Sequence, residues 1–113
     1  FGERFAKAHG TWPTSLQIGV YSAVNHYLKA VDAAGTDARD AVAAKMRELP
    51  VQDIFVKDGK VRADGLMIHD MLLTEVKPAS EAKACGDVFK GVSAIPGDQA
   101  FRPLDQGGCP LVK

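Results

Sequence analysis

The feature that most constrains the fold is a series of apolar side chains at helical spacing between residues 15 and 34. They fall at i, i+4, i+7, i+8 and i+11 and are Val20, Val24, Tyr27, Leu28 and Val31. Thr14 or Ser15 is expected to cap the start of this helix, and Gly35 to end it. The pattern therefore predicts a long amphipathic helix whose apolar face needs a partner.

A second helix is predicted directly after the first. Thr36 or Asp37 can cap it, and Pro50 closes it. Its apolar stripe consists of Ala38, Val42, Met46 and Leu49. We expect the two consecutive helices to pack on a common surface.

The first ten residues have the pattern of the last turns of another amphipathic helix. Phe1, Phe5 and Ala8 share one face, and Gly10 is a suitable residue to end the helix. None of the residue types that usually cap a helix start precedes Phe1. We therefore expect the chain to be the end of a longer protein, with the partner of this face located elsewhere.

Beyond Pro50 the apolar pattern changes to that of β-strands. The Asp-Gly pairs at 58–59 and 64–65 are typical of tight turns between strands. The segment 66–77 is apolar on both faces for much of its length, which suits a strand covered on both sides. The predicted strands are 54–56, 60–62, 66–77 and 88–95.

The segments around the last strand are predicted to be less regular. Residues 77–83 are polar, contain a proline and are expected to form a linker. Pro96 and Gly97 end the strand, and residues 98–101 can form a single helical turn. The tail to Lys113 is expected to be mostly irregular.

The charge pattern argues against a nucleic-acid or membrane-surface partner. Fourteen Lys and Arg balance fourteen Asp and Glu, and the two signs are interspersed. No basic stripe is therefore available to hold a phosphate backbone or an anionic bilayer. The apolar runs also fall well short of the roughly 20 residues that span a membrane.

The two cysteines, Cys85 and Cys109, both lie beside glycines in loop-like sequence. Neither has a Cys or His partner at the short spacing of a zinc site. A disulfide formed in an oxidising compartment is the preferred interpretation, and it would stabilise the tail by about 3 kcal/mol. Two unlinked thiols are the alternative.

The sequence contains no recognisable catalytic or metal-binding pattern. His9, His26 and His69 do not share i, i+4 spacing, and the adjacent His69 and Asp70 would point to opposite faces of a strand. A Gly-rich phosphate loop, an HExxH motif and a Gly-x-Ser-x-Gly elbow are also missing. We therefore expect structural or exposed histidines, and neither an enzyme nor a bound cofactor or metal.

Several segments, taken in order, resemble a known family. They are Phe5–Lys7, Gly19–Val24, Ala30–Thr36, Gly59–Gly65, Ile95–Leu104 and Gly108–Leu111. Their order and spacing resemble the C-terminal third of the type I periplasmic solute-binding proteins of ABC transporters, in the leucine/isoleucine/valine-binding branch. The resemblance spans essentially the whole chain.

The resemblance implies an α/β fold in which two lobes flank a cleft. Residues 1–12 would be a helix end from the second lobe, and residues 13–78 would be a segment of the first lobe. Residues 79–113 would form the crossover and the C-terminal segment of the second lobe. Because the sheets would be incomplete in this fragment, it would expose roughly hundreds of Å² of apolar surface and is expected to self-associate.

The resemblance also implies the solute-binding component of an ABC importer, located in the periplasm. Such a protein captures a branched-chain amino acid, or another small hydrophobic or aromatic carboxylate, and delivers it to a membrane permease. The family's binding pattern implies that Leu16, Gln17 and Tyr21 contact the ligand. Leu16 and Tyr21 could instead begin the core stripe of the long helix.

Two other functions fit the same sequence. A ligand-sensing receptor could reuse the same fold and cleft. A structural or dimerisation module could be built from the two helices and the hairpin, and it would need no ligand.

Overall fold

The computed structural model describes residues 1–110 and 112 of the chain. The helices are α1 (Gly2–His9), α2 (Ser15–Ala34), α3 (Arg39–Glu48), α4 (Gly97–Ala100) and the short 3-10 helix η1 (Leu104–Gln106). The strands are β1 (Lys60–Val61), β2 (Met67–Ile68), β3 (Met71–Val76) and β4 (Phe89–Ile95). Leu111 and Lys113, at the end of the predicted irregular tail, lie outside the described residues.

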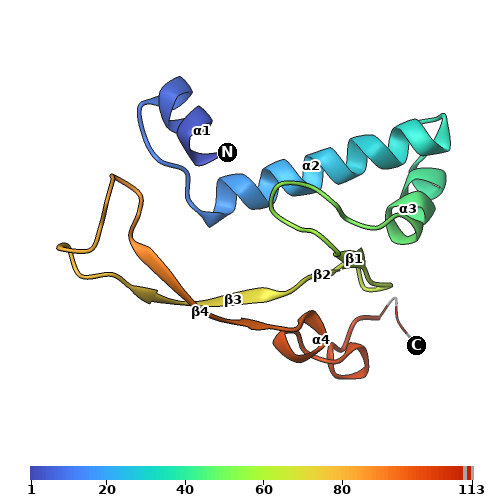
Figure 1. The fold of residues 1–113 in the computed structure, drawn as a ribbon. Helices are drawn as coiled ribbons and strands as arrows, with labels where there is room; N and C mark the ends of the chain where they lie inside the picture. Colours follow the sequence, from blue (N-terminus) through green and yellow to red (C-terminus); the bar gives the residue numbers. More distant parts are fainter. Residues whose placement is uncertain (111, 113) are drawn as a thin grey trace.

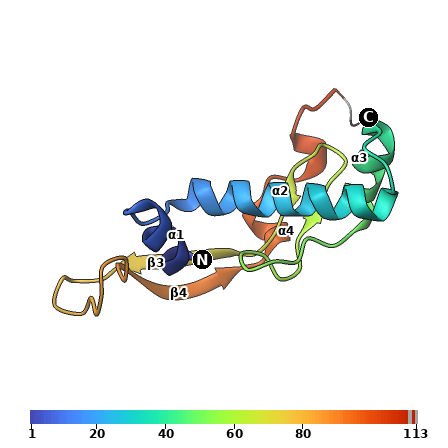
Figure 2. The ribbon, with the colours of Figure 1, turned by 90° about the horizontal axis from the view of Figure 1, so that it is seen from above.

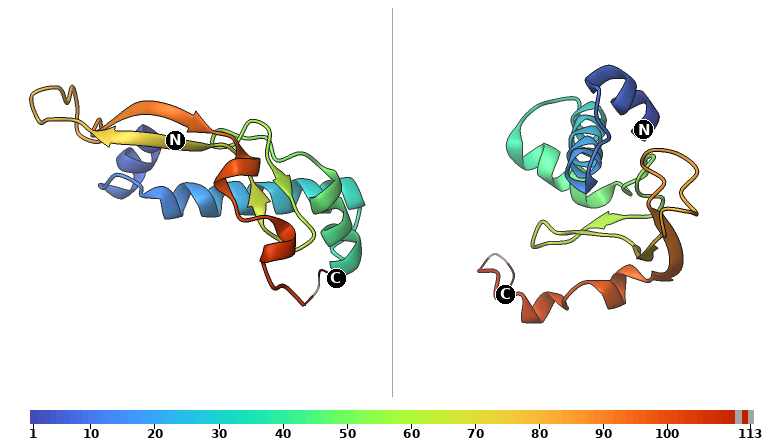
Figure 3. Two further views of the ribbon diagram at one scale, coloured as in Figure 1. Left: turned by 90° about the horizontal axis from the view of Figure 1, so that it is seen from below. Right: turned by 90° about the vertical axis from the view of Figure 1, so that its left-hand side faces the viewer.

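The helices and strands form an open, elongated arrangement. Helices α1, α2 and α3 lie on one side of the strands, and α4 lies on the other (Figures 1 and 3). Helix α2 runs along more than half of the long dimension (Figure 2). The radius of gyration is 16.9 Å, whereas a compact domain of this length has about 13 Å. The chain is therefore not packed around one closed core.

The helix boundaries agree closely with the sequence predictions. Gly10 and Gly35 end α1 and α2 in the left-handed conformation, with φ angles of 70° and 63°. Thr14 caps α2, as predicted. For α3 the capping position is Ala38 rather than Thr36 or Asp37. Thr36 nevertheless acts just before the helix, because its hydroxyl oxygen accepts the backbone N–H of Ala38 at 3.2 Å.

Helices α2 and α3 pack together, but not through the predicted apolar stripe of α2. The buried residues of α2 are Ser22, His26 and Ala30, which face Val42 of α3 and the loop that follows it. The stripe residues Val20 and Leu28 are 63% and 57% exposed. The face of α2 that carries Ser22, His26 and Ala30 is therefore buried, whereas the face that carries Val20, Val24 and Leu28 is largely exposed.

The predicted strand at 54–56 is wrong, because Asp53 folds this segment into a turn. Its Oδ1 accepts the backbone N–H groups of Phe55 (2.7 Å) and Val56 (2.9 Å). Its own N–H donates to the Val56 carbonyl at 2.7 Å. A side chain that satisfies its neighbours' backbone groups competes with strand pairing. The pairing in this region is limited to a single bridge between Val51 and Gly59.

The predicted turn at 64–65 joins β1 to β2, which pair antiparallel. The predicted hairpin turn at 58–59 is not formed, because Gly59 itself pairs with Val51. The predicted strand at 66–77 is divided into β2 and β3 at His69 and Asp70. There, Asp70 Oδ1 accepts the Gly97 N–H at 3.0 Å. A Cβ atom at Gly97 would lie only 2.8 Å from Ile68 Cγ2, so the backbone at Gly97 packs directly on this junction.

Strands β3 and β4 form an antiparallel ribbon that is exposed along both strands. The expected cover on both faces of β3 is therefore not provided by the described part of the chain. The linker at 77–83 and the helical turn near 98–101 are confirmed as the loop after β3 and as α4. The hairpin loop is tied together by Lys77, whose Nζ lies 2.5 Å from Asp87 Oδ1.

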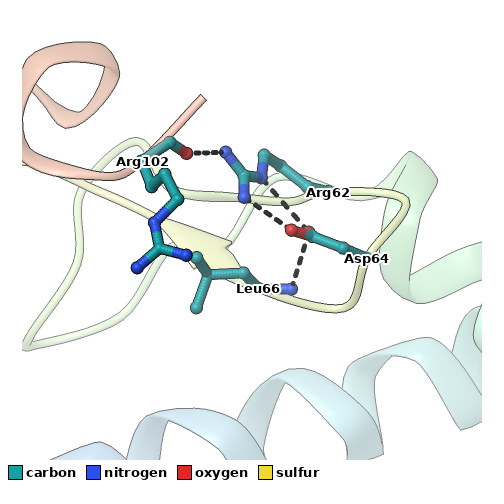
Figure 4. A network of polar contacts seen from close by, with 4 residues as sticks. All are labelled: Arg62, Asp64, Leu66 and Arg102. Atoms are coloured by element: carbon teal, nitrogen blue, oxygen red, sulfur yellow. Dashed lines mark hydrogen bonds and ion pairs between the residues drawn. The ribbon is translucent and has the colours of Figure 1, made fainter. Parts of the chain in front are cut away.

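Each end of the ribbon packs against a different part of the chain. At the loop end, Trp12 fills the space beside Gly86, where a Cβ atom would lie 2.8 Å from the indole ring. At the other end, Arg62 Nη1 donates to the Arg102 carbonyl at 2.7 Å and Nη2 pairs with Asp64 at 2.5 Å (Figure 4). The hydrogen bond from Arg62 holds the pKa of Asp64 below its usual value. Segment 97–107 thus lies beside the β1–β2 hairpin.

The predicted disulfide between Cys85 and Cys109 is not formed, and both are free thiols. Cys85 lies in the loop before β4, and Cys109 follows η1 beyond the other end of β4. A seven-residue strand spans about 23 Å, whereas bonded cysteines have Cα atoms within about 7 Å. The extended ribbon therefore keeps the two cysteines apart.

His26 provides a test of the α2–α3 contact. Its Nε2 donates to the Met46 carbonyl at 2.8 Å, and the side chain is only 3% exposed. His26→Ala in the full-length protein is expected to lower the free energy of unfolding by about 1–3 kcal/mol, since it leaves a cavity and a carbonyl without its donor. Urea denaturation measures this. His9→Ala removes only an exposed side chain with a surface contact to the Phe5 ring, so it should lower stability less than His26→Ala does, and equal losses would contradict the assignment.

Asp53 should make stability depend on pH. Partial burial raises its pKa, but hydrogen bonds from Ser22, Val56 and Phe55 and the charge of Lys29 outweigh burial, so the pKa lies below the ordinary 3.8. A carboxyl group whose pKa is lower in the folded than in the unfolded state stabilises the folded state at pH values above the unfolded-state pKa. This stabilisation is lost as the pH falls through the folded-state pKa. The stability difference between wild type and Asp53→Ala should therefore be constant above about pH 5 and shrink below pH 4. Urea denaturation between pH 3 and 7 checks this, and a difference that grows on acidification would refute it.

Candidate functional site

An apolar groove of about 700 Å³ lies between α1 and α2. All three residues predicted to bind a ligand, Leu16, Gln17 and Tyr21, line it. The complete lining consists of Phe1, Phe5, Leu16, Gln17, Val20, Tyr21, Val24, Asn25 and Leu28. The groove therefore contains both the predicted site and much of the apolar stripe of α2.

Aromatic contacts build the wall where α1 meets α2. The rings of Phe1 and Tyr21 have centroids 5.4 Å apart, and those of Phe1 and Phe5 are 5.8 Å apart. Such separations are within the favourable range for aromatic pairs. Sequence reasoning identified the apolar face of α1 but did not assign Phe1 and Phe5 to the site. The sequence signal for Phe1 and Phe5 was their helical spacing, which shows that they share a face but not which segment that face contacts.

A reciprocal cap fixes the first turn of α2 beside the groove. The Thr14 hydroxyl oxygen accepts the Leu16 N–H at 3.2 Å. The Gln17 Oε1 accepts the Thr14 N–H at 2.8 Å and the Thr14 hydroxyl at 2.5 Å. This arrangement satisfies backbone donors that otherwise have no partner at a helix start. The turn carries Leu16, whose side chain is 76% exposed at the rim of the groove.

The composition of the groove suits recognition of a ligand by its shape and apolar surface rather than by its charge. Its polar side chains are Gln17, Tyr21 and Asn25, and all nine lining residues are uncharged. Apolar walls with a few oriented hydrogen-bonding groups are typical of small-molecule sites. The arrangement can therefore hold a small, largely apolar molecule.

The three histidines lie in separate environments. His9 is exposed near the end of α1, and His26 is buried between α2 and α3. His69 contacts the rings of Phe55 and Phe101, whose centroids are 5.2 and 5.5 Å from its own. Within residues 1–110 and 112, no three His, Cys, Asp or Glu side chains gather as a metal site would require. The histidines thus share no common centre.

In the part of the chain that the structure describes, none of the helices combines the length and the apolar character needed to cross a bilayer.

A sequence model of the periplasmic binding proteins matches residues 1–83. Comparison with curated protein sequences finds no significant match. Among solved structures, a periplasmic binding protein from Burkholderia mallei is similar, with 43% identity and a TM-score of 0.92. A branched chain amino acid ABC transporter periplasmic ligand-binding protein from Burkholderia xenovorans is 34% identical, with a TM-score of 0.91.

Both similarities cover 99% of this chain and 30% of the matched chain. The chain thus spans about a third of the length of these structures. The resemblance to periplasmic solute-binding proteins is therefore confirmed. The sequence model and both similar structures point to the same family. The chain belongs to the periplasmic binding protein family, as part of its α/β fold.

Proposed function

We propose that the chain is part of the solute-binding component of an ABC importer in the periplasm. The observation that carries this proposal is the groove between α1 and α2, in which Leu16 and Tyr21 lie together. The ligand is a branched-chain amino acid or another small hydrophobic or aromatic carboxylate. After capture it is delivered to a membrane permease.

The chemistry of the groove supports this class of ligand. Its apolar walls favour a hydrocarbon or aromatic side chain, and uncharged amide and phenol groups can orient it. Binding and release need no covalent step, nucleophile or cofactor. The Burkholderia xenovorans structure supports the transport role, because that protein is a branched chain amino acid ABC transporter periplasmic ligand-binding protein.

The chain is proposed to serve both lobes of the family fold. Residues 1–12 are assigned to the second lobe and residues 13–78 to the first. For residues 79–113, the contact of Trp12 with Gly86 supports a second-lobe position for the hairpin loop. The hydrogen bond of Arg62 to Arg102 favours the first lobe for segment 97–107, in place of the second lobe that the sequence suggested.

The ligand class can be tested on the full-length protein. Thermal shift measurements would use leucine, isoleucine, valine, phenylalanine and benzoate as probes. A ligand at 100 times its dissociation constant stabilises the folded state by about 2.7 kcal/mol, which a thermal shift detects easily. Binding of at least one probe supports the transport proposal. If none binds and the protein self-associates instead, a structural module explains the exposed apolar surface better.

Leu16 provides a specific test of the groove. Leu16→Ala removes part of its apolar wall and is expected to weaken the affinity for the best probe about tenfold, measured by calorimetry. Leu72→Ala is the matched control, because Leu72 is 73% exposed on β3 and does not line the groove. The control should retain wild-type affinity. Equal affinities of the two variants would place the ligand elsewhere.

The 113-residue chain on its own is expected to self-associate. Side chains such as Val20, Leu28 and Phe89 are more than half exposed, and burial of apolar surface favours association. Size-exclusion chromatography with light scattering would show dimers or larger species that grow with concentration. A monodisperse monomer with a sharp unfolding transition would argue against this expectation.

A further inference from the structure

The side chain of Gln17 lines the groove, but its acceptor atom is already occupied. Oε1 receives both the N–H and the hydroxyl of Thr14. In return, the Thr14 oxygen receives the N–H of Leu16. An amide oxygen has two lone pairs, so these two donors satisfy it. The side-chain oxygen of Gln17 is therefore used in capping α2, whether or not a ligand occupies the groove.

We propose that Thr14 and Gln17 are positioning residues of the ligand site. They hold Leu16 at the rim of the groove by locking the first turn of α2, and Gln17 acts through this turn rather than by contacting the ligand. The inference rests on the proposed function and changes the role that the sequence suggested for Gln17.

The first turn of α2 needs this lock because packing does not hold it. Thr14, Leu16 and Gln17 are all exposed, and the Leu16 side chain is 76% accessible. The first turn of α2 also contains no acidic side chain that would favour the helix start electrostatically. Hydrogen bonds of the cap are thus the main interactions that fix the backbone at Leu16. Tyr21 differs, since its ring is held against Phe1 at 5.4 Å.

The rival role for Gln17 is direct donation from its Nε2 to the ligand carboxylate. The two roles differ in how Gln17 depends on Thr14. A positioning role makes the two residues one unit, so that removing either weakens the same cap: loss of Thr14 removes the acceptor of the Leu16 N–H, and loss of Gln17 removes the group that anchors Thr14. Direct donation would make the effects of the two residues independent.

A double-mutant cycle in the full-length protein separates these roles. The affinity for the tightest probe of the panel would be measured by calorimetry for Thr14→Ala, Gln17→Ala and the double variant. Positioning predicts that each single change weakens binding by about two- to fivefold. It also predicts that the double variant is no weaker than the weaker single, and that Thr14→Ser restores affinity. Thr14 does not line the groove, so its effect cannot arise from a lost ligand contact.

Thr36→Ala is the matched control for loss of a threonine at a helix start. Thr36 accepts the Ala38 N–H at 3.2 Å, the same length as the bond from Leu16 to Thr14, but it precedes α3. This variant should retain wild-type affinity. The proposal is overturned if Gln17→Ala weakens binding tenfold or more while Thr14→Ala has no effect, or if the two effects multiply.

Amide hydrogen exchange tests the cap without any ligand. Exchange at Leu16 should rise several-fold in Thr14→Ala, which removes its acceptor, and by a smaller factor in Gln17→Ala, which only releases that acceptor, while exchange in the last turns of α2 stays unchanged. If no probe binds, the proposed function fails, and this measurement alone decides the role of the cap. Unchanged exchange at Leu16 in Thr14→Ala would overturn the proposal.

Discussion

The carboxylate of Asp53 connects α2 with the loop that leads into the strands. One oxygen receives the Ser22 hydroxyl at 2.6 Å, and the other receives two backbone N–H groups of its own loop. The loop then places Val51 and Val56, which are 1% and 3% exposed, against the rest of the chain. The β1–β2 hairpin follows directly, so the position of the strands relative to α2 depends on this carboxylate. An ionised side chain suits the task because hydrogen bonds to a charged acceptor are stronger than those to a neutral one.

The two faces of α2 make different contacts. The face with Ser22, His26 and Ala30 is buried against α3 and the Asp53 loop. The face with Val20, Val24 and Leu28 lines the groove together with α1. Because internal packing uses the small and polar side chains, the large apolar ones remain available at the groove. This division accounts for an open, elongated shape in a chain of ordinary hydrophobic content.

The proposed site combines the first turn of α2 with side chains from the body of that helix and from the N-terminal segment. Leu16 lies in the first turn of α2, where the Thr14–Gln17 cap holds the backbone. Phe1 directly precedes α1 and contacts Tyr21 of α2, while Phe5 of α1 packs against Phe1. Such a site has fixed walls but requires no reactive group. This is consistent with the family to which the chain belongs, whose members are binding proteins.

The sequence by itself determined the features that depend on neighbouring residues. Gly10, Gly35 and Thr14 fixed the helix ends, and the Asp64–Gly65 pair fixed the turn between β1 and β2, because capping and turn geometry involve residues only a few positions apart. The resemblance to the family pointed to Leu16 and Tyr21, although not to Phe1, which contacts Tyr21. Tertiary structure decided the rest. The Ser22–Asp53 bond joins residues 31 apart and helps to hold a β-prone segment in a turn, and the Asp70–Gly97 bond joins residues 27 apart at the break in the long strand. The extended β3–β4 ribbon likewise separated the two cysteines. No local pattern encodes such contacts, because their energy depends on which distant groups the folded chain brings together.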